Sequence, residues 1–126
     1  MRILVDTQIC LWVLGDSRRL SPAARRVLDS AEAVFLSAAS VWEAAIKSSV
    51  GKLVIDLDEF ISNVGASGFR PLPVTAEHAV RVATLPLHHR DPFDRLLVAQ
   101  AIHETMRLLT ADATLARYSE LIMTVD

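Results

Sequence analysis

Short apolar runs alternate with helical segments along the chain, and this alternation is the feature that most restricts its fold. Five runs are apolar and are followed by turn or polar residues, so they are expected to form strands: residues 2–5, 33–36, 69–74, 108–110 and 121–125. Helices are expected at residues 7–14, 21–31, 40–50, 57–64, 75–85, 91–106 and 113–118, with an extended connection at 52–55. Strands alternating with helices predict an α/β sandwich with a mostly parallel sheet of about five strands. Pro71 and Pro73 place the third run at an edge of that sheet.

The composition predicts one globular domain spanning residues 1–126. Hydrophobic residues make up 52% and charged residues 22%, which excludes a disordered chain. No uncharged stretch exceeds ten residues and no apolar signal region precedes Asp6, so neither a membrane span nor a secretory signal is expected. Cys10 is the single cysteine and lies among apolar neighbours, which predicts a buried thiol in a cytoplasmic protein without an internal disulfide.

Four acidic residues share one setting, at or just beyond the end of an apolar run and close to where a helix should begin. They are Asp6, Glu43, Asp94 and Asp112. If the runs are parallel strands, these acids collect at one end of one sheet, where open α/β folds bind their ligands. Carboxylates so close together repel one another unless a divalent cation lies between them. The arrangement therefore predicts metal-assisted hydrolysis with Mg²⁺ or Mn²⁺.

Each acid also has a structural interpretation. Ser40 and Glu43 have the spacing of a helix capping box, Asp91 and Asp94 fit the first turn of a helix, and Asp112 can cap the next one. For single acids, capping is the commoner role. Capping, however, requires no spatial relation between helices, and Asp91 already suffices for its helix, which leaves Asp94 without a capping role.

The net charge of −2 conceals a split between acidic and basic residues. Without the four candidate site acids, 11 acidic and 13 basic residues remain. The basic side chains form two groups along the sequence: Arg18, Arg19, Arg25 and Arg26, and then His88, His89, Arg90 and Arg95. A basic rim around an acidic centre is compatible with a polyanionic substrate. Solvated helix faces are the alternative, and they are the favoured interpretation for the first group.

Four motifs in order carry a resemblance to a known family. They are Asp6-Thr7 with Leu11-Trp12; residues 34–47 (VFLSAASVWEAAIK) followed by Gly51-Lys52-Leu53; residues 89–101 (HRDPFDRLLVAQA); and residues 109–112 (LTAD) with Tyr118. Through these motifs nearly the whole chain resembles the PIN-domain ribonucleases, specifically the VapC-type toxins of bacterial toxin–antitoxin pairs. Gln8 and Leu115 depart from the pattern, where relatives often carry histidine and an aromatic residue. Neither departure touches a carboxylate.

The resemblance implies a parallel sheet with helices on both faces and an acidic site at Asp6, Glu43, Asp94 and Asp112. It also implies divalent-metal-dependent endonucleolytic cleavage of RNA, a homodimer, and an antitoxin that blocks the acidic cleft. Thr7 and Thr110 adjoin site acids and are expected to help hold ligands or waters. Arg95 is expected to contact either phosphate or an acid.

The remaining candidates are weaker. Lys47 has helical spacing to pair with Glu43. A surface position is the expectation for the four histidines, His78, His88, His89 and His103. Core or dimer packing, rather than base stacking, is the expectation for Trp12 and Trp42. Two rival functions stay open, another phosphoester hydrolase on a doubly wound sheet and a non-catalytic interaction domain. The first is weakened because no second aspartate follows Asp6 by two residues, and the second because all four carboxylates are intact.

Overall fold

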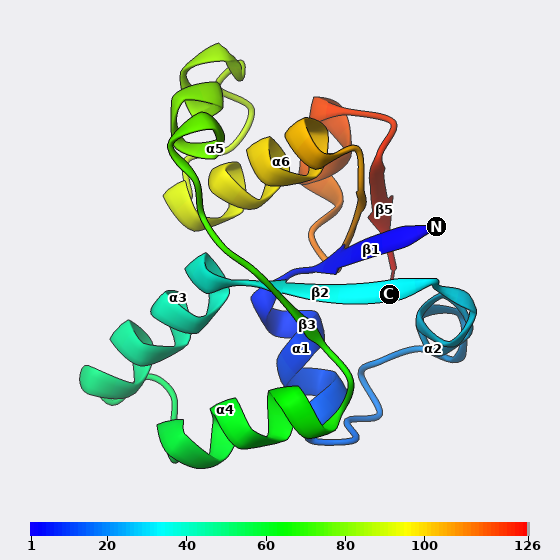
Figure 1. The fold of residues 1–126 in the computed structure, drawn as a ribbon, viewed down its shortest axis with the longest axis vertical. Coiled ribbons are helices and arrows are strands. Elements are labelled where there is room, and N and C mark those ends of the chain that lie inside the picture. Colours follow the sequence, from blue (N-terminus) through cyan, green and yellow to red (C-terminus); the bar gives the residue numbers. More distant parts are fainter. Residues whose placement is uncertain (126) are drawn as a thin grey trace.

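The computed structural model describes residues 1–125 and contains one five-stranded sheet in which every neighbouring pair of strands is parallel (Figure 1). The strands are β1 (Arg2–Val5), β2 (Ala33–Ser37), β3 (Arg70–Leu72), β4 (Arg107–Thr110) and β5 (Ile122–Thr124), in the order β3-β2-β1-β4-β5. The chain builds outward from β1 to β3 and then crosses to the other side of β1. The predicted five-stranded parallel sheet is confirmed, and its doubly wound order places a switch point between β1 and β4, where such folds bind ligands.

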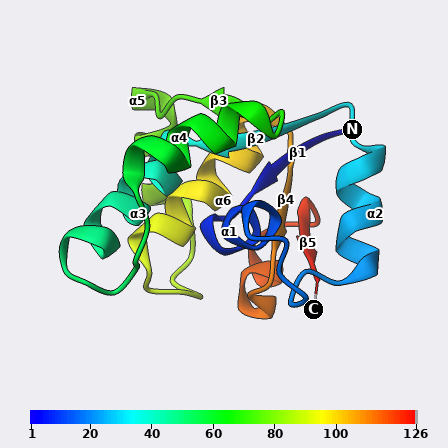
Figure 2. The ribbon, with the colours of Figure 1, turned by 90° about the horizontal axis from the view of Figure 1, so that it is seen from below.

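Helices cover both faces of the sheet. They are α1 (Thr7–Leu14), α2 (Pro22–Ser30), α3 (Ala38–Ser49), α4 (Leu57–Ala66), α5 (Ala76–Arg81) and α6 (Pro92–Glu104), with 3₁₀ helices η1 (Val82–Thr84) and η2 (Ala113–Tyr118). Figure 1 shows α5 and α6 on one side of the sheet and α1, α2 and α4 on the other, and Figure 2 shows α1 between α3 and α2. Across residues 1–125, no helix has both the length and the apolarity needed to cross a membrane.

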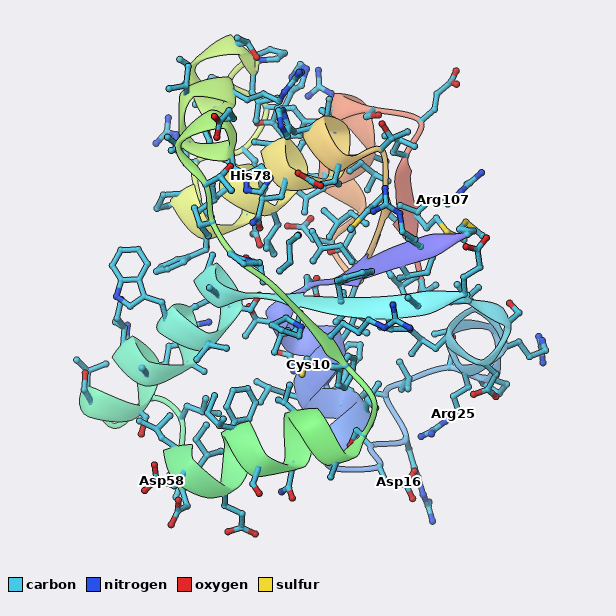
Figure 3. The ribbon with its side chains drawn as sticks, viewed as in Figure 1. Cys10, Asp16, Arg25, Asp58, His78 and Arg107 are labelled. Atoms are coloured by element: carbon cyan, nitrogen blue, oxygen red, sulfur yellow. The ribbon has the colours of Figure 1, made fainter. Side chains whose placement is uncertain are left out.

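Two apolar cores follow from the alternation of side chains along the strands. Ile3 and Val5 face the core shared with α1, α2 and α4, whereas Leu4 faces the core shared with α6 and η2. Each such side chain that is fully buried contributes roughly 1.5–3 kcal/mol. Cys10 lies in the first core (Figure 3), where burial raises the pKa of its thiol to about 12. The predicted burial of this thiol is confirmed.

Helix α3 begins two residues earlier than predicted, and this changes which serine is its N-cap. Ser37 ends β2 and is the N-cap of α3, with its hydroxyl accepting a hydrogen bond of 3.0 Å from the backbone N–H of Ala39. Ser40 therefore lies inside the helix, where its side chain is buried. The capping-box interpretation of Ser40 and Glu43 is wrong, because the serine one turn earlier already takes that role.

Two smaller corrections concern helix type. The segment predicted as one helix over residues 75–85 is an α-helix that ends at Arg81 and continues as the 3₁₀ turn η1. The segment 113–118 is also 3₁₀. The extended connection predicted at residues 52–55 contains no strand, and β3 lies at the edge of the sheet as its prolines predicted.

Candidate metal centre

A cleft of about 460 Å³ opens where β1, β2 and β4 end, beside the first turn of α6. Its walls include all four predicted acids, Asp6, Glu43, Asp94 and Asp112, together with Asp91 as a fifth carboxylate. Asp6, Asp91 with Asp94, and Asp112 lie at the starts of α1, α6 and η2, whereas Glu43 lies one turn into α3, and the parallel sheet brings them to one edge. The spatial grouping expected from the sequence is present.

Asp6 joins the architecture to the cleft. It follows β1 and caps α1, with Oδ1 accepting from the backbone N–H of Ile9 at 2.7 Å. The Thr110 hydroxyl on β4 donates to Oδ2 at 2.6 Å, which ties the ends of two neighbouring strands together. Burial raises the pKa of the Asp6 carboxyl, and the hydrogen bond from Thr110 opposes that rise.

Glu43 lies in the second turn of α3 and is buried, although it caps no helix. Its Oε1 accepts a hydrogen bond of 2.6 Å from the Thr7 hydroxyl at the start of α1. Its Oε2 lies 3.0 Å from Nζ of Lys47, which confirms the predicted pair. Thr7 and Thr110 therefore act alike, because each orients one cleft carboxylate from a neighbouring element.

Asp94 is the third residue of α6 and is not needed as its cap. The N-cap is Asp91, whose Oδ1 accepts from the backbone N–H groups of Phe93 and Asp94 at 2.8 and 3.2 Å. Burial, followed by repulsion from Asp91, raises the pKa of the Asp94 carboxyl to about 7. Asp6 and Glu43 add to this rise, and His89 opposes it. The negative charge of Asp94 is therefore poorly compensated within residues 1–125.

Asp112 caps η2 and contacts a residue that sequence reasoning left outside the site. Its Oδ1 accepts from the hydroxyl and the backbone N–H of Thr114 at 2.6 and 3.0 Å, and the bond from the hydroxyl is the main cause that lowers its pKa. Its Oδ2 lies 2.9 Å from Nε2 of His89. The surface expectation for His89 is wrong, because the path of residues 86–91 brings the ring to the cleft acids.

His78 also departs from the surface expectation, for a structural reason. It is buried between α5 and α6 (Figure 3), with Nδ1 accepting from the backbone N–H of Thr75 at 3.0 Å and Nε2 lying 2.8 Å from Oε2 of Glu104. A neutral ring that accepts at Nδ1 carries its hydrogen at Nε2 and donates it to Glu104. Although His103 lies nearby, this geometry makes the group a helix cap and anchor rather than a metal site.

The basic residues divide into those at the cleft and those away from it. Arg95 donates to the backbone carbonyls of Val82, Leu85 and Pro86, so its guanidinium contacts neither an acid nor the cleft. Arg25 pairs with Asp16 at 3.1 Å on the side of the molecule away from α3 (Figure 3). The basic side chains lining the cleft, within residues 1–125, are those of Lys47 and Lys52.

The two tryptophans differ in position. Trp12 packs against the first core and also lines the cleft. Trp42 is 60% exposed, with its ring edge-to-face against Phe93 at a centroid distance of 5.2 Å. Packing describes Trp12, whereas most of Trp42 faces solvent at the surface of α3.

The donor set of the cleft fits a hard divalent cation. Its candidate ligands are carboxylate oxygens, which suit Mg²⁺ and Mn²⁺, whereas thiolate and imidazole groups select softer metals. The raised pKa of Asp94 indicates a site that gains from added positive charge. The arrangement can therefore hold a cation beside a water molecule and a phosphate group.

Comparison with known proteins gives consistent results at three levels. The family model of the PIN domain matches residues 3–121. Ribonuclease VapC22 from Mycobacterium tuberculosis is 29% identical over 116 residues, covering 90% of this chain and 88% of the relative. A chain in the crystal structure of VapBC2 from Rickettsia felis bound to a DNA fragment from their promoter superposes with a TM-score of 0.73 at 16% identity, covering 100% of both chains. A chain of a toxin–antitoxin complex from Klebsiella pneumoniae gives a TM-score of 0.68 at 17% identity, with 97% and 96% covered.

Proposed function

Because the chain belongs to the PIN-domain family, we propose that it is a divalent-metal-dependent endoribonuclease and the toxin of a toxin–antitoxin pair. The observation that carries this proposal is the grouping of four carboxylates in one cleft at the switch point of the sheet. The ribonuclease at 29% identity supports the reaction, and the toxin–antitoxin structures of the same fold support the biological setting.

Asp6, Asp94 and Asp112, with Glu43, are the residues that would hold Mg²⁺ or Mn²⁺. When bound, such a cation lowers the pKa of a coordinated water and stabilises charge on a phosphodiester. Hydrogen bonds within the chain orient the candidate ligands. Thr110 and the backbone of Ile9 fix both oxygens of Asp6, so this carboxylate is oriented without any rearrangement.

Glu43 is assigned the role of orienting the attacking water. The Thr7 hydroxyl and Lys47 each hold one of its oxygens, and its side chain is buried at the cleft wall. Each contact occupies one lone pair, so this carboxylate can accept a hydrogen bond from water only in the directions that remain. That restriction is what in-line attack on a phosphodiester requires.

Lys52 provides a phosphate contact on the wall that continues from α3. Gly51 has a φ of +76°, a conformation that favours glycine, and it reverses the chain after α3. The backbone N–H of Lys52 then donates to the carbonyl of Lys47 at 2.9 Å. Because Lys47 is paired with Glu43, Lys52 is the cation available for a substrate phosphate.

Lys52→Gln is expected to raise KM about 5–10-fold with little change in kcat. Loss of one contact to single-stranded RNA should also make the dependence of log(kcat/KM) on log[salt] shallower by about 0.7. Arg26→Gln is the matched control, because Arg26 is exposed on α2, at the other end of the molecule from α3 (Figures 1 and 2). Equal changes in slope for both variants would mean that net charge, and not a contact, is responsible.

The surface of α3 supports a protein partner. Trp42, Ile46 and Val50 follow one another at helical spacing and are 60%, 38% and 61% exposed. Apolar surface of this kind marks interaction sites in soluble proteins. A homodimer and a cognate antitoxin that blocks the acidic cleft are both part of the proposal.

The direct test is cleavage of single-stranded RNA by the purified protein with Mg²⁺ or Mn²⁺ and with chelator. Internal cleavage is expected with either ion and should disappear when the ion is removed, because the carboxylates alone repel a phosphate. Asp6→Asn protein purified in parallel controls for a contaminating nuclease. Cleavage that persists in chelator would refute metal dependence. RNA binding without cleavage in any divalent ion would instead favour a non-catalytic interaction domain.

A further inference from the structure

The contacts of His89 give this residue a specific task in the cleft. We propose that His89 is a positioning residue, which holds the Asp112 carboxylate through a hydrogen fixed on Nε2 and is not itself a metal ligand. The inference rests on the proposed function only in taking the acidic cleft as a metal site. Nothing in the resemblance to the family assigned this histidine a role.

The backbone determines which ring nitrogen carries the hydrogen. The N–H of Asp91 donates to Nδ1 of His89 at 3.1 Å. A neutral ring that accepts at Nδ1 carries its hydrogen at Nε2. That nitrogen lies 2.9 Å from Oδ2 of Asp112 and 3.7 Å from Oδ2 of Asp94, so its hydrogen points at the pair of acids.

This tautomer separates His89 from the ligands beside it. His89, Asp94 and Asp112 lie close enough together for one ion to reach all three. A ring nitrogen that carries a hydrogen has no lone pair to offer a cation. If the hydrogen were on Nδ1 instead, it would face the N–H of Asp91, and two donors would meet. His89 therefore acts on a cation through Asp112.

Hydrogen bonds to the hydroxyl oxygen of Tyr118 form a brace for the loop that carries His89, residues 86–91. Oη of Tyr118 accepts from the backbone N–H groups of His88 and His89 at 3.1 and 2.9 Å. Arg95 donates to the same oxygen at 3.1 Å and to the carbonyl of Pro86 at 3.0 Å. The helix that Tyr118 ends is η2, which Asp112 caps. Both sides of the contact between His89 and Asp112 are thus attached to one short helix.

The consequence is a carboxylate held at both oxygens. Thr114 donates to Oδ1 of Asp112 and His89 to Oδ2. Oδ1 accepts two hydrogen bonds from Thr114, so Oδ2 is the oxygen that keeps a further lone pair for a cation, while rotation of the carboxylate is restricted. Hydrogen-bond partners of metal ligands typically change metal affinity about 10–100-fold, so His89 should contribute within this range.

Two substitutions at position 89 test the donor. His89→Leu removes it, whereas His89→Gln places an amide N–H where Nε2 lies and can restore it. Mn²⁺ affinity, measured by calorimetry, should fall about 10–100-fold for leucine and only several-fold for glutamine. Thermal unfolding without metal should change little in either variant. Tyr118→Phe, which removes the oxygen of the brace, should give a smaller loss in the same direction.

Pulsed electron paramagnetic resonance of bound Mn²⁺ supplies an independent reading, because a directly ligated ring nitrogen gives a resolved nitrogen coupling. None is expected. Unchanged Mn²⁺ affinity in His89→Leu would overturn the inference. An equal loss of about 10–100-fold in both variants would also overturn it. In that case a resolved nitrogen coupling would mean that the ring ligates the ion, and its absence would mean that the ring acts through packing. Expected affinities without RNA cleavage would refute the proposed function alone, and no Mn²⁺ binding by the unaltered protein would refute the metal site and this inference together.

Discussion

Asp94→Asn is expected to abolish divalent-ion binding and RNA cleavage together, whereas Asp91→Asn leaves both nearly intact. Asparagine caps a helix about as well as aspartate, so at position 91 it can still accept from the N–H groups of Phe93 and Asp94. At position 94 it removes an anionic oxygen from a site assigned to metal. Cleavage should fall by about two to three orders of magnitude, as losses of groups that act in the transition state do.

Cleavage rates and Mn²⁺ titrations of the two purified variants separate these roles. Stability is the weaker criterion, because Asp91 also repels Asp94 and its replacement relieves part of that repulsion. If Asp91→Asn abolished cleavage and Asp94→Asn did not, the roles assigned within this turn would have to be exchanged.

Asp94→Asn should also change how the stability of the metal-free protein depends on pH. The pKa of Asp94 rises from an ordinary 3.8 to about 7 on folding. The stability that the folded protein gains by holding this carboxyl protonated is therefore fully present below about pH 4 and is lost as the pH rises through 7. Asparagine does not ionise, so Asp94→Asn keeps this stability and should be more stable than the unaltered protein at pH 8, by on the order of 1–3 kcal/mol. The side chain stays 24% exposed, which keeps the effect below the full shift. Thermal unfolding at pH 4 and pH 8 in chelator measures the difference, which should be absent at pH 4.

Glu43→Gln is expected to reduce kcat by orders of magnitude while the melting temperature changes little. The amide oxygen can still accept from the Thr7 hydroxyl, and the residue caps no helix, so the fold loses only a half-exposed ion pair with Lys47. The anionic oxygen that orients water is lost. Single-turnover cleavage and thermal unfolding are the measurements.

Lys47→Gln is the matched control for that substitution. It removes the same ion pair but leaves the carboxylate of Glu43 in place. Its kcat should stay within several-fold of the unaltered value. Equal losses in the two variants would show that the ion pair matters and the carboxylate does not, and a large fall in melting temperature with retained cleavage would make Glu43 structural.

The parallel sheet and the grouping of the acids could be predicted because they follow from local signals. Each apolar run is short and ends at a capping or turn residue, and strands that alternate with helices are the pattern of a parallel sheet. Parallel strands end at the same edge, so Asp6 and Asp112, which follow β1 and β4, had to meet. Helix boundaries were less determined, because Ser37 and Ser40 both offer an N-cap and only packing selects the first.

The histidines and Arg95 could not be placed from sequence because their partners depend on how the loops run. The ring of His89 reaches Asp112, 23 residues away in the chain, from a loop whose backbone is bound to Tyr118. His78 has the capping-box spacing to Thr75, but its second nitrogen lies against Glu104, 26 residues away in the chain, and no local spacing signals that contact. Arg95 finds three backbone carbonyls, whose positions depend on the turn η1.

The four carboxylates differ in what the protein would lose with each of them. Asp6 and Asp112 are helix caps as well as cleft residues, so their replacement by alanine removes a cap at a cost of about 1 kcal/mol. Asp94 and Glu43 cap nothing. If the chain arrests growth as proposed, cells that escape through a folded but silent protein should carry changes mainly at these two positions. Such proteins would still bind the antitoxin. They would therefore compete for it with active copies made in the same cell and leave some of those copies without an inhibitor.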